Sequence, residues 1–338
     1  MSFFCERTTS VLFPIRHRAV LFLLAASVIV GCGPNYAPPT VPESVATDLF
    51  VLGADHSLTA GIRVSELYRS FVSQLDQWVD VGDRSFSDRN REILEQLGLD
   101  PDTHDISFYA SLDTDPREAV PAMVLRAPLP PSILEKLAEK SNDFSRVDGT
   151  SDLNATIDSN VPWFSVSENS TAFFVARSSD VVLAASGSAE HLAQMLARSD
   201  EAAVDSPTGV FLMVGGADVW MVASDISLIL DALSPDDWPS EIHQIISSIV
   251  AAGGSIELGE ESVLFSLYLE PKDGIEARDI ADLVRGGIAL LKMESEDDDL
   301  LIDFVERLRV SEYNGFSRVQ IQISETDLKE WAETISRH

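Results

Sequence analysis

Cys32 is the residue whose position in this sequence carries the most specific chemistry. It follows Gly31 and a run of twelve uncharged residues, Ala19–Val30, which itself follows the basic segment Arg16–Arg18. A basic stretch, a short apolar stretch and small residues form a secretory signal. A bilayer-spanning helix needs about 20 apolar residues, so this run is too short to be one. The sequence therefore predicts an export signal over residues 1–31.

The end of this signal also defines a place for lipid chemistry. Ile29-Val30-Gly31-Cys32 resembles the lipobox of bacterial lipoproteins. The resemblance implies thioether attachment of diacylglycerol to Cys32, cleavage before it and N-acylation of it. Gly33 stands where lipoproteins retained in the inner membrane carry Asp. The resemblance thus implies an outer-membrane lipoprotein of the cell envelope that faces the periplasm and contacts the membrane through the lipid on Cys32.

Metal and acid–base chemistry find little support in the pattern of the polar residues. The histidines beyond the signal show no HxxxH, HExxH or HxH spacing and are expected at the surface or in caps; they are His56, His104, His191, His243 and His338. The acidic stretch 294–299 lacks the central glycine of an EF-hand-like calcium loop. We expect a solvated loop between two helices there, with weak divalent-cation binding as the alternative. No cofactor or metal site is predicted.

Nucleophile and phosphate motifs are missing from the sequence as well. There is no GxSxG or SxxK, and Ser188 is expected to cap a helix. The glycine pairs fit neither GxxxxGK[ST] nor GxGxxG; we interpret Gly215-Gly216 and Gly253-Gly254 as turns and Gly286-Gly287 as a close helix contact. No catalytic residue is predicted, and a hydrolase would require distant Asp, Glu and His to converge in a cleft.

The tryptophans are the remaining candidates for ligand contact. They could line a sugar or lipid pocket, but tryptophan more often fills the core between a sheet and its helices, and we expect that role. Trp238, between Asp237 and Pro239, is the one expected to be exposed. The five are Trp78, Trp163, Trp220, Trp238 and Trp331.

Charge and cysteine content exclude several classes of function. The net charge is −31 at pH 7, and loss of residues 1–31, with three arginines and one glutamate, makes it −33. Such a surface repels nucleic acid and anionic phosphate ligands, so no nucleic-acid partner is expected. With Cys5 in the signal and Cys32 lipidated, no cysteine is left for a disulfide or a zinc site.

Hydrophobic periodicity divides the rest of the chain into a Pro-rich tether, residues 32–47, and two halves, residues 48–200 and 208–338. In the first half the predicted strands are 48–52, 56–64, 105–112, 120–126, 163–166, 171–177 and 181–186, and the predicted helices are 65–79, 88–97, 130–140 and 189–198. In the second half the predicted strands are 209–214, 218–223, 254–258, 262–270, 309–313 and 318–323, and the predicted helices are 225–251, 275–293, 300–307 and 325–335.

The two halves share an order of elements: strand, helix, two strands, helix, two strands, helix. Short turns between neighbouring strands favour antiparallel pairing. We therefore expect an α+β fold of two similar sheet-and-helix halves with helices packed on one face, either as two subdomains or with one continuous sheet. The stretch 97–112 is similar to uncharacterised bacterial exported proteins with duplicated α+β ectodomains, a resemblance that carries no functional residue.

Two functions fit these observations. The first is non-enzymatic: a structural, binding or envelope-assembly component that contacts a partner protein in the envelope through a sheet face or the groove between the halves. The alternative is a carrier or sensor of a small apolar or lipid ligand. An apolar pocket above about 300 Å³ would favour the carrier, and a filled core would dismiss it.

Overall fold

The computed structural model describes the greater part of the chain beyond the predicted signal. The described residues are 36–52, 58–69, 91, 94–95, 98–112, 121–129, 132–140, 144–147, 163–167, 171–176, 178–186, 189–199, 209–224, 226, 247–259, 261–294 and 299–336. The predicted export signal and Cys32 lie outside this part. So do residues 70–79 of the helix expected at 65–79, and most of the helices expected at 88–97 and 225–251.

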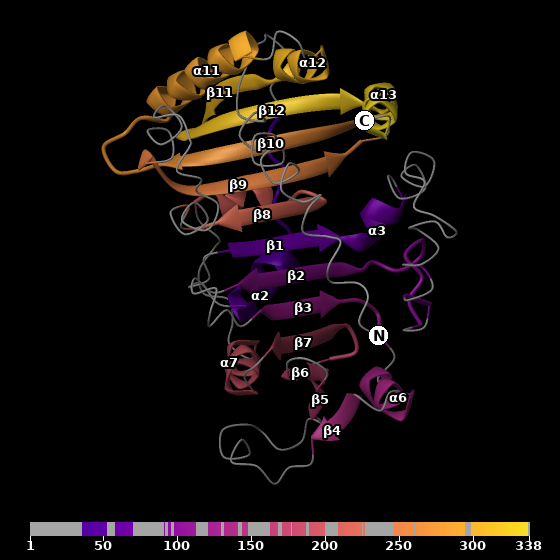
Figure 1. Ribbon diagram of the computed structural model, residues 1–338. Helices are drawn as coiled ribbons and strands as arrows, with labels where there is room; N and C mark the ends of the chain where they lie inside the picture. Colours follow the sequence, from indigo (N-terminus) through magenta and orange to yellow (C-terminus); the bar gives the residue numbers. More distant parts are fainter. Residues whose placement is uncertain are drawn as a thin grey trace, which may run out of the picture.

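One twelve-stranded sheet runs through both halves of the described chain, and every pair of neighbouring strands is antiparallel. Its strand order is β11-β12-β10-β9-β8-β1-β2-β3-β7-β6-β5-β4, a ladder that can be followed from top to bottom in Figure 1. The strands are β1 Leu58–Arg63, β2 Ser107–Leu112, β3 Ala122–Arg126, β4 Phe144–Val147, β5 Trp163–Ser167, β6 Thr171–Ala176, β7 Val181–Ser186, β8 Val219–Ala223, β9 Ile249–Leu258, β10 Ser262–Pro271, β11 Arg309–Tyr313 and β12 Phe316–Ser324.

The halves repeat one strand order and meet in the middle of the sheet. From the junction outward the first half reads β1-β2-β3-β7-β6, and the second reads β8-β9-β10-β12-β11. The junction is the antiparallel pairing of β1 with β8, in which Leu58 lies opposite Ala223. β5 and β4 extend the first half only. The α+β fold with two similar halves is confirmed, and the continuous sheet is the arrangement adopted.

The described helices lie on both faces of this sheet. We call the side that carries Ile62 face A and the side that carries Thr59 face B; residues alternate between the two along each strand. On face B lie α2 Glu43–Leu52, α7 Ala189–Ser199 and α8 Phe211–Val214. On face A lie α6 Ile133–Lys140, α11 Ala277–Glu294, α12 Asp299–Arg307 and α13 Glu325–Ser336. A short helix, α3 Val64–Leu67, follows β1. The helices thus differ in one respect from the expectation, which put them on one face.

Face B is closed by α2, α7 and α8 over the centre and the first half of the sheet. Leu52, Leu183, Leu192 and Met195 are fully buried there. An ion pair holds α2 to β3: Arg126 donates from Nε and Nη2 to the two carboxylate oxygens of Asp48, at 2.9 and 2.7 Å. Asp48 is 2% exposed, so the guanidinium supplies the compensation that a buried carboxylate needs.

The described residues before α2, 36–42, belong to the predicted Pro-rich tether and contact the domain. Tyr36 donates its hydroxyl hydrogen to Gln322 Oε1 at 2.9 Å, and Arg318 Nη1 donates to the carbonyl of Tyr36 at 2.6 Å. Further along, a Cβ at Gly216 would lie 2.4 Å from the carbonyl oxygen of Pro39. Tyr36 and Pro39 are therefore in contact with the folded domain, although the first half was predicted to begin at residue 48.

Two predicted strands are helices, and one helix was predicted too long. Residues 48–52 belong to α2, whose buried positions Val45, Asp48, Val51 and Leu52 recur at helical spacing. Residues 209–214 contain α8, and 249–251 begin β9 in place of ending a helix. Short apolar runs do not distinguish buried helix from buried strand. β4 was not predicted.

Candidate functional site

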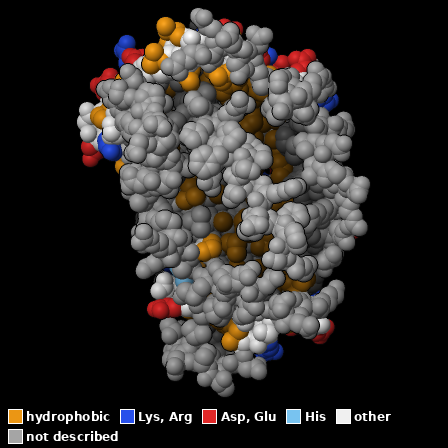
Figure 2. Space-filling view, in the orientation of Figure 1, with side chains coloured by type: hydrophobic (Ala, Val, Ile, Leu, Met, Phe, Trp, Pro, Cys, Tyr) orange, Lys and Arg blue, Asp and Glu red, His pale blue; other side chains and the backbone are white. Residues whose placement is uncertain are grey.

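An apolar cavity of about 470 Å³ lies on face A over the centre of the sheet. The helices of face A belong to two separate clusters on either side of it. α11, α12 and α13 pack over β10, β11 and β12, and α6 packs over the first half. Figure 2 shows hydrophobic side chains on this part of the molecule. The six strands below the cavity are β2, β1, β8, β9, β10 and β12.

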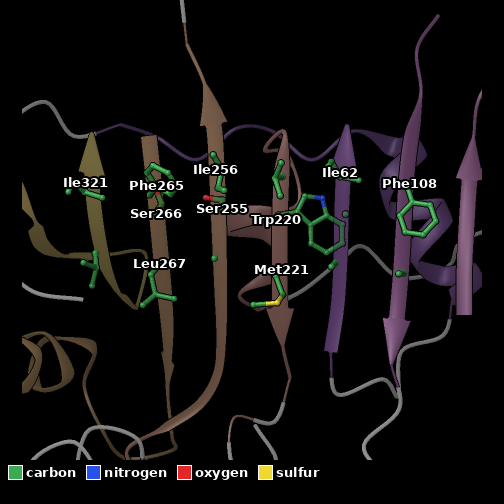
Figure 3. A pocket seen from close by; sticks show the side chains of 16 residues that line it. Ile62, Phe108, Trp220, Met221, Ser255, Ile256, Phe265, Ser266, Leu267 and Ile321 are labelled. Carbon is green, nitrogen blue, oxygen red and sulfur yellow. The ribbon is translucent and has the colours of Figure 1, made fainter. Parts of the chain in front are cut away.

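The floor of the cavity consists of two parallel rows of side chains, each with one residue from each of the six strands. What we call the low row contains Ala110, Ala60, Met221, Gly254, Leu267 and Val319. The high row, two residues along each strand, contains Phe108, Ile62, Val219, Ile256, Phe265 and Ile321. In Figure 3 the labelled side chains of the high row stand side by side, with Met221 and Leu267 below them. The low row includes three small residues, Ala110, Ala60 and Gly254, and the high row includes none, so the two rows differ in height.

The burial pattern of the central strands shows that face B is the filled side and face A the open one. On β9, Ala251, Gly253 and Ser255 are buried, whereas their face A neighbours are half-buried or exposed. On β8, Trp220 and Val222 of face B are buried, whereas Val219 of face A is half-buried and Met221, in the low row, is 43% exposed. A methionine side chain at that exposure above an otherwise packed sheet is available for contact with a ligand.

Two adjacent glycines of β9 show how differently the two faces are packed. A Cβ at Gly253 would meet Val210 Cγ2 of the α8 region at 2.9 Å, so this glycine lets α8 lie close to face B. A Cβ at Gly254 would meet no atom within 4 Å, because it would point into the cavity. Gly253-Gly254 was predicted as a turn, but both residues lie within β9. Gly215-Gly216 does follow α8 as a turn, and a Cβ at Gly286 would have open space in place of the predicted helix contact.

Aromatic side chains on face B pack beneath the cavity floor at the pairing of β1 with β8. Trp220 of β8 lies on face B, with Phe211 at 5.1 Å and Tyr109 at 6.2 Å between ring centroids. A Cβ at Gly61 would lie 2.4 Å from the indole of Trp220, so only glycine allows this ring to cross β1. Burial raises the pKa of the Tyr109 hydroxyl. The floor at β1 and β8 is therefore held from behind by a packed core.

Among the described residues that line the cavity, none carries a charge or an imidazole. Its two serines belong to face B by strand alternation, and Ser266 Oγ there accepts a hydrogen bond from Gln320 Nε2 at 2.9 Å. Glu257 of β9, which also lies on face B, is the nearest described residue with a shifted pKa. Burial and the Asp218 carboxylate raise the pKa of its carboxyl group. The described lining is suited to apolar contact and offers no group for proton transfer.

A second recess, of about 410 Å³, is polar and lies beside α12 and α13. Two of its charged groups, Arg307 and Asp327, pair with each other. Arg307 bonds to Asp303 and Asp327 and stacks on the Trp331 ring at 5.7 Å. We regard it as a structural ion-pair network.

The histidines and acidic residues singled out in the sequence do not gather at either recess. His104 Nδ1 accepts the backbone N–H of Asp100 at 3.0 Å within a turn. His191 lies on α7, and His56, His243 and His338 are outside the described residues. Glu294 ends α11 and Asp299 begins α12, and residues 295–298 of the predicted acidic loop lie outside the described residues. Within the described chain, no group of three His, Cys, Asp or Glu could hold a metal ion.

The described tryptophans fill cores, as predicted. Trp220 is 3% exposed, Trp163 packs against the face B cluster, and Trp331 packs on Phe304 at 5.6 Å. Trp78, Trp238 and Ser188 lie outside the described residues. No described helix has the length and apolar character needed to cross a bilayer. The cavity was not predicted from the sequence, although Phe265 and Leu267 alternate with the buried Ser266 along β10.

Comparisons with known proteins identify a fold and no family. No family model and no curated protein matches the chain. Among solved structures, crystal form IV of TP0453 is similar with a TM-score of 0.50 at 12% identity, covering 85% of this chain and 96% of that one. Crystal form I has a TM-score of 0.45 at 12% identity, with 87% and 96% covered. Form III gives 0.45 at 10%, with 83% and 96% covered. At this identity the likeness to form IV concerns the fold alone.

Proposed function

We propose that this chain is a lipid-anchored protein of the cell envelope that binds a small apolar or lipid ligand in the face A cavity. The observation that carries the proposal is the cavity itself: about 470 Å³ over a floor of aliphatic and aromatic side chains. Ligand pockets commonly measure about 300–1,000 Å³ and are mostly apolar. Between a purely structural component and a carrier or sensor, this favours the carrier or sensor.

The energetic argument is the transfer of apolar surface from water. A floor that exposes Met221 and half-buries its neighbours costs free energy while it is hydrated, at about 25 cal/mol for each Å². Binding of an apolar ligand removes water from the floor and from the apolar surface of the ligand, so the hydration cost of both surfaces is lost. Because the described lining has no charge, the proposed ligand makes its contacts through hydrocarbon groups. A polar group on the ligand would lie at the opening of the cavity.

The envelope location rests on the lipobox-like sequence before Cys32. One acyl chain binds a bilayer weakly, whereas two or three hold stably. A protein anchored in this way would work beside a supply of apolar molecules. An excess of negative charge on the same chain disfavours contact with anionic headgroups.

The function is tested by placing a charge in the cavity. Met221→Glu puts a carboxylate in the low row. A bound apolar ligand would remove the water that hydrates this carboxylate, which costs free energy. We expect binding of the neutral dye Nile red, followed by its fluorescence on the purified full-length chain, to weaken at least about tenfold. That is a loss of about 1.4 kcal/mol.

The matched control is Leu290→Glu. Leu290 has the same exposure, 43%, but lies on α11 and outside the cavity lining. Its replacement should leave dye affinity within about twofold of the wild type. Equal affinity of the Met221→Glu variant and the wild type, or an equal loss in both variants, would refute binding in this cavity.

A further inference from the structure

The shape of the cavity floor restricts the ligand more than its polarity does. The lining includes two residues of face A from each of six strands, and not the next residues in either direction, such as Leu58 or Leu269. Six neighbouring strands about 4.8 Å apart give a length of roughly 24 Å, whereas two successive residues on one face are only about 7 Å apart. The floor is thus long and narrow, and its long axis runs across the strands.

The low row forms a channel along this axis. Three of its six residues are Gly or Ala, namely Ala110, Ala60 and Gly254, whereas the smallest residue of the high row is Val219. The high row therefore stands above the low row as a wall. Met221, between Ala60 and Gly254, has the flexible side chain that can lie aside when the channel is filled.

The cross-section of the channel matches one hydrocarbon chain. The volume of the whole cavity, about 470 Å³, taken evenly along about 24 Å gives a mean section of roughly 20 Å². This is a little over 4 Å on a side, near the separation of about 4 Å between carbon atoms in contact. The hydrocarbon core of a bilayer is about 30 Å thick, so one extended lipid chain covers roughly 15 Å and fits within the length.

From this geometry we propose that the ligand is a single unbranched hydrocarbon chain lying in the low row, across the β1–β8 junction, and that Gly254 sets the length of chain accepted. This inference rests on the proposed function and specifies its ligand. The chain crosses Ala110, Ala60, Met221 and Gly254 in that order, and so touches both halves of the molecule. A fused ring system is wider than the low row and lies over both rows, where it makes poorer contact with the floor than a chain that lies in the low row.

The test uses 1-alkanols from octanol to hexadecanol as neutral linear probes that displace Nile red from the full-length protein. Each added CH₂ should strengthen binding about fourfold until the channel is full. Cholesterol, which is fused and rigid, should bind at least about tenfold more weakly than hexadecanol. A flat dependence on chain length, or cholesterol binding as tightly as hexadecanol, would overturn the inference.

The variant Gly254→Leu tests whether position 254 sets the length of the chain that binds. Its Cβ meets no atom within 4 Å, so the side chain enters the channel without displacing the core. We expect hexadecanol to lose at least about tenfold in affinity and octanol less than about threefold. The matched control is Gly286→Leu on α11, where a Cβ also meets nothing, and it should change neither.

Each outcome separates the inference from the function on which it rests. If Nile red, alkanols and cholesterol all fail to bind the wild type, the proposed function fails. If dye and cholesterol bind but linear alkanols do not displace the dye, only the linear-chain ligand is refuted. If Gly254→Leu weakens octanol and hexadecanol equally, Gly254 does not set the length.

Discussion

Asp327 illustrates how single polar residues fix the end of the sheet beside the second half's helices. It accepts hydrogen bonds from Arg307 Nη2 at 3.0 Å and from the Ser324 hydroxyl at 2.5 Å, while Ser324 Oγ accepts its backbone N–H at 3.2 Å. This reciprocal pair caps the first turn of α13. Arg307 first, and Ser324 second, lower the pKa of Asp327 from 3.8 to about 2.

The shifted pKa of Asp327 predicts a defined pH dependence of stability. Because the pKa is lower in the folded state, the contribution is complete above the unfolded value of 3.8 and is lost as the pH falls toward about 2. At pH 7, Asp327→Asn should lower the free energy of unfolding by about 1–2 kcal/mol, given partial exposure and solvent screening. Urea denaturation from pH 7 to pH 3 should show the difference narrowing below about pH 4.

Asp282→Asn is the control for this prediction. Asp282 pairs with Arg285 one turn along α11 at an exposed position. Such pairs contribute little, so the loss should stay below about 0.5 kcal/mol. A gap between wild type and Asp327→Asn that persists unchanged to pH 3 would contradict the assigned shift.

At the scale of elements, the contact between α8 and β9 depends on a missing side chain. Gly253 lies below Val210 and Val214, whereas its neighbour Gly254 faces the cavity. The same substitution at these adjacent positions should therefore have opposite effects. Gly253→Ala overpacks the contact and should cost about 1–2 kcal/mol, while Gly254→Ala should be neutral or stabilise by up to about 1 kcal/mol.

Thermal melting of the two alanine variants provides the measurement. We expect a lower Tm for Gly253→Ala and an unchanged or slightly higher Tm for Gly254→Ala. Equal shifts would show that β9 does not present its two faces to such different surroundings.

Elements with a full period of hydrophobic residues were predictable from the sequence, and short apolar segments were not. The strand predicted at 262–270 became β10, and the helix predicted at 275–293 became α11, because each is long enough to show its period. Residues 209–214 are apolar throughout and were assigned the wrong structure for that reason. The low row could not have been predicted, because Ala60, Met221 and Gly254 become neighbours only through strand pairing.

At the scale of the whole molecule, the candidate site is a product of the joined halves. The floor takes β2 and β1 from one half and β8, β9, β10 and β12 from the other. Neither half alone provides the length of the channel. Each half begins with the strand at the junction, β1 in one and β8 in the other. Their pairing therefore creates a central surface that neither half has alone.

The proposed anchor also belongs to this scale, and it can be tested by mass spectrometry of the mature N-terminus. We expect the protein from native membranes to begin at Cys32 and to carry the added mass of a diacylglyceryl group and an N-acyl chain. Cys32→Ser should abolish both modifications. An intact Met1 on the protein isolated from cells would contradict the export and lipidation proposals.

The hydrogen bonds of Tyr36 with Arg318 and Gln322 have a mechanical consequence for such an anchor. Only four peptide steps separate Cys32 from Tyr36, a reach of at most about 14 Å. If the thioether forms, this short connection would keep the β12 side of the folded domain close to the bilayer. The protein could then reach only partners at the membrane surface.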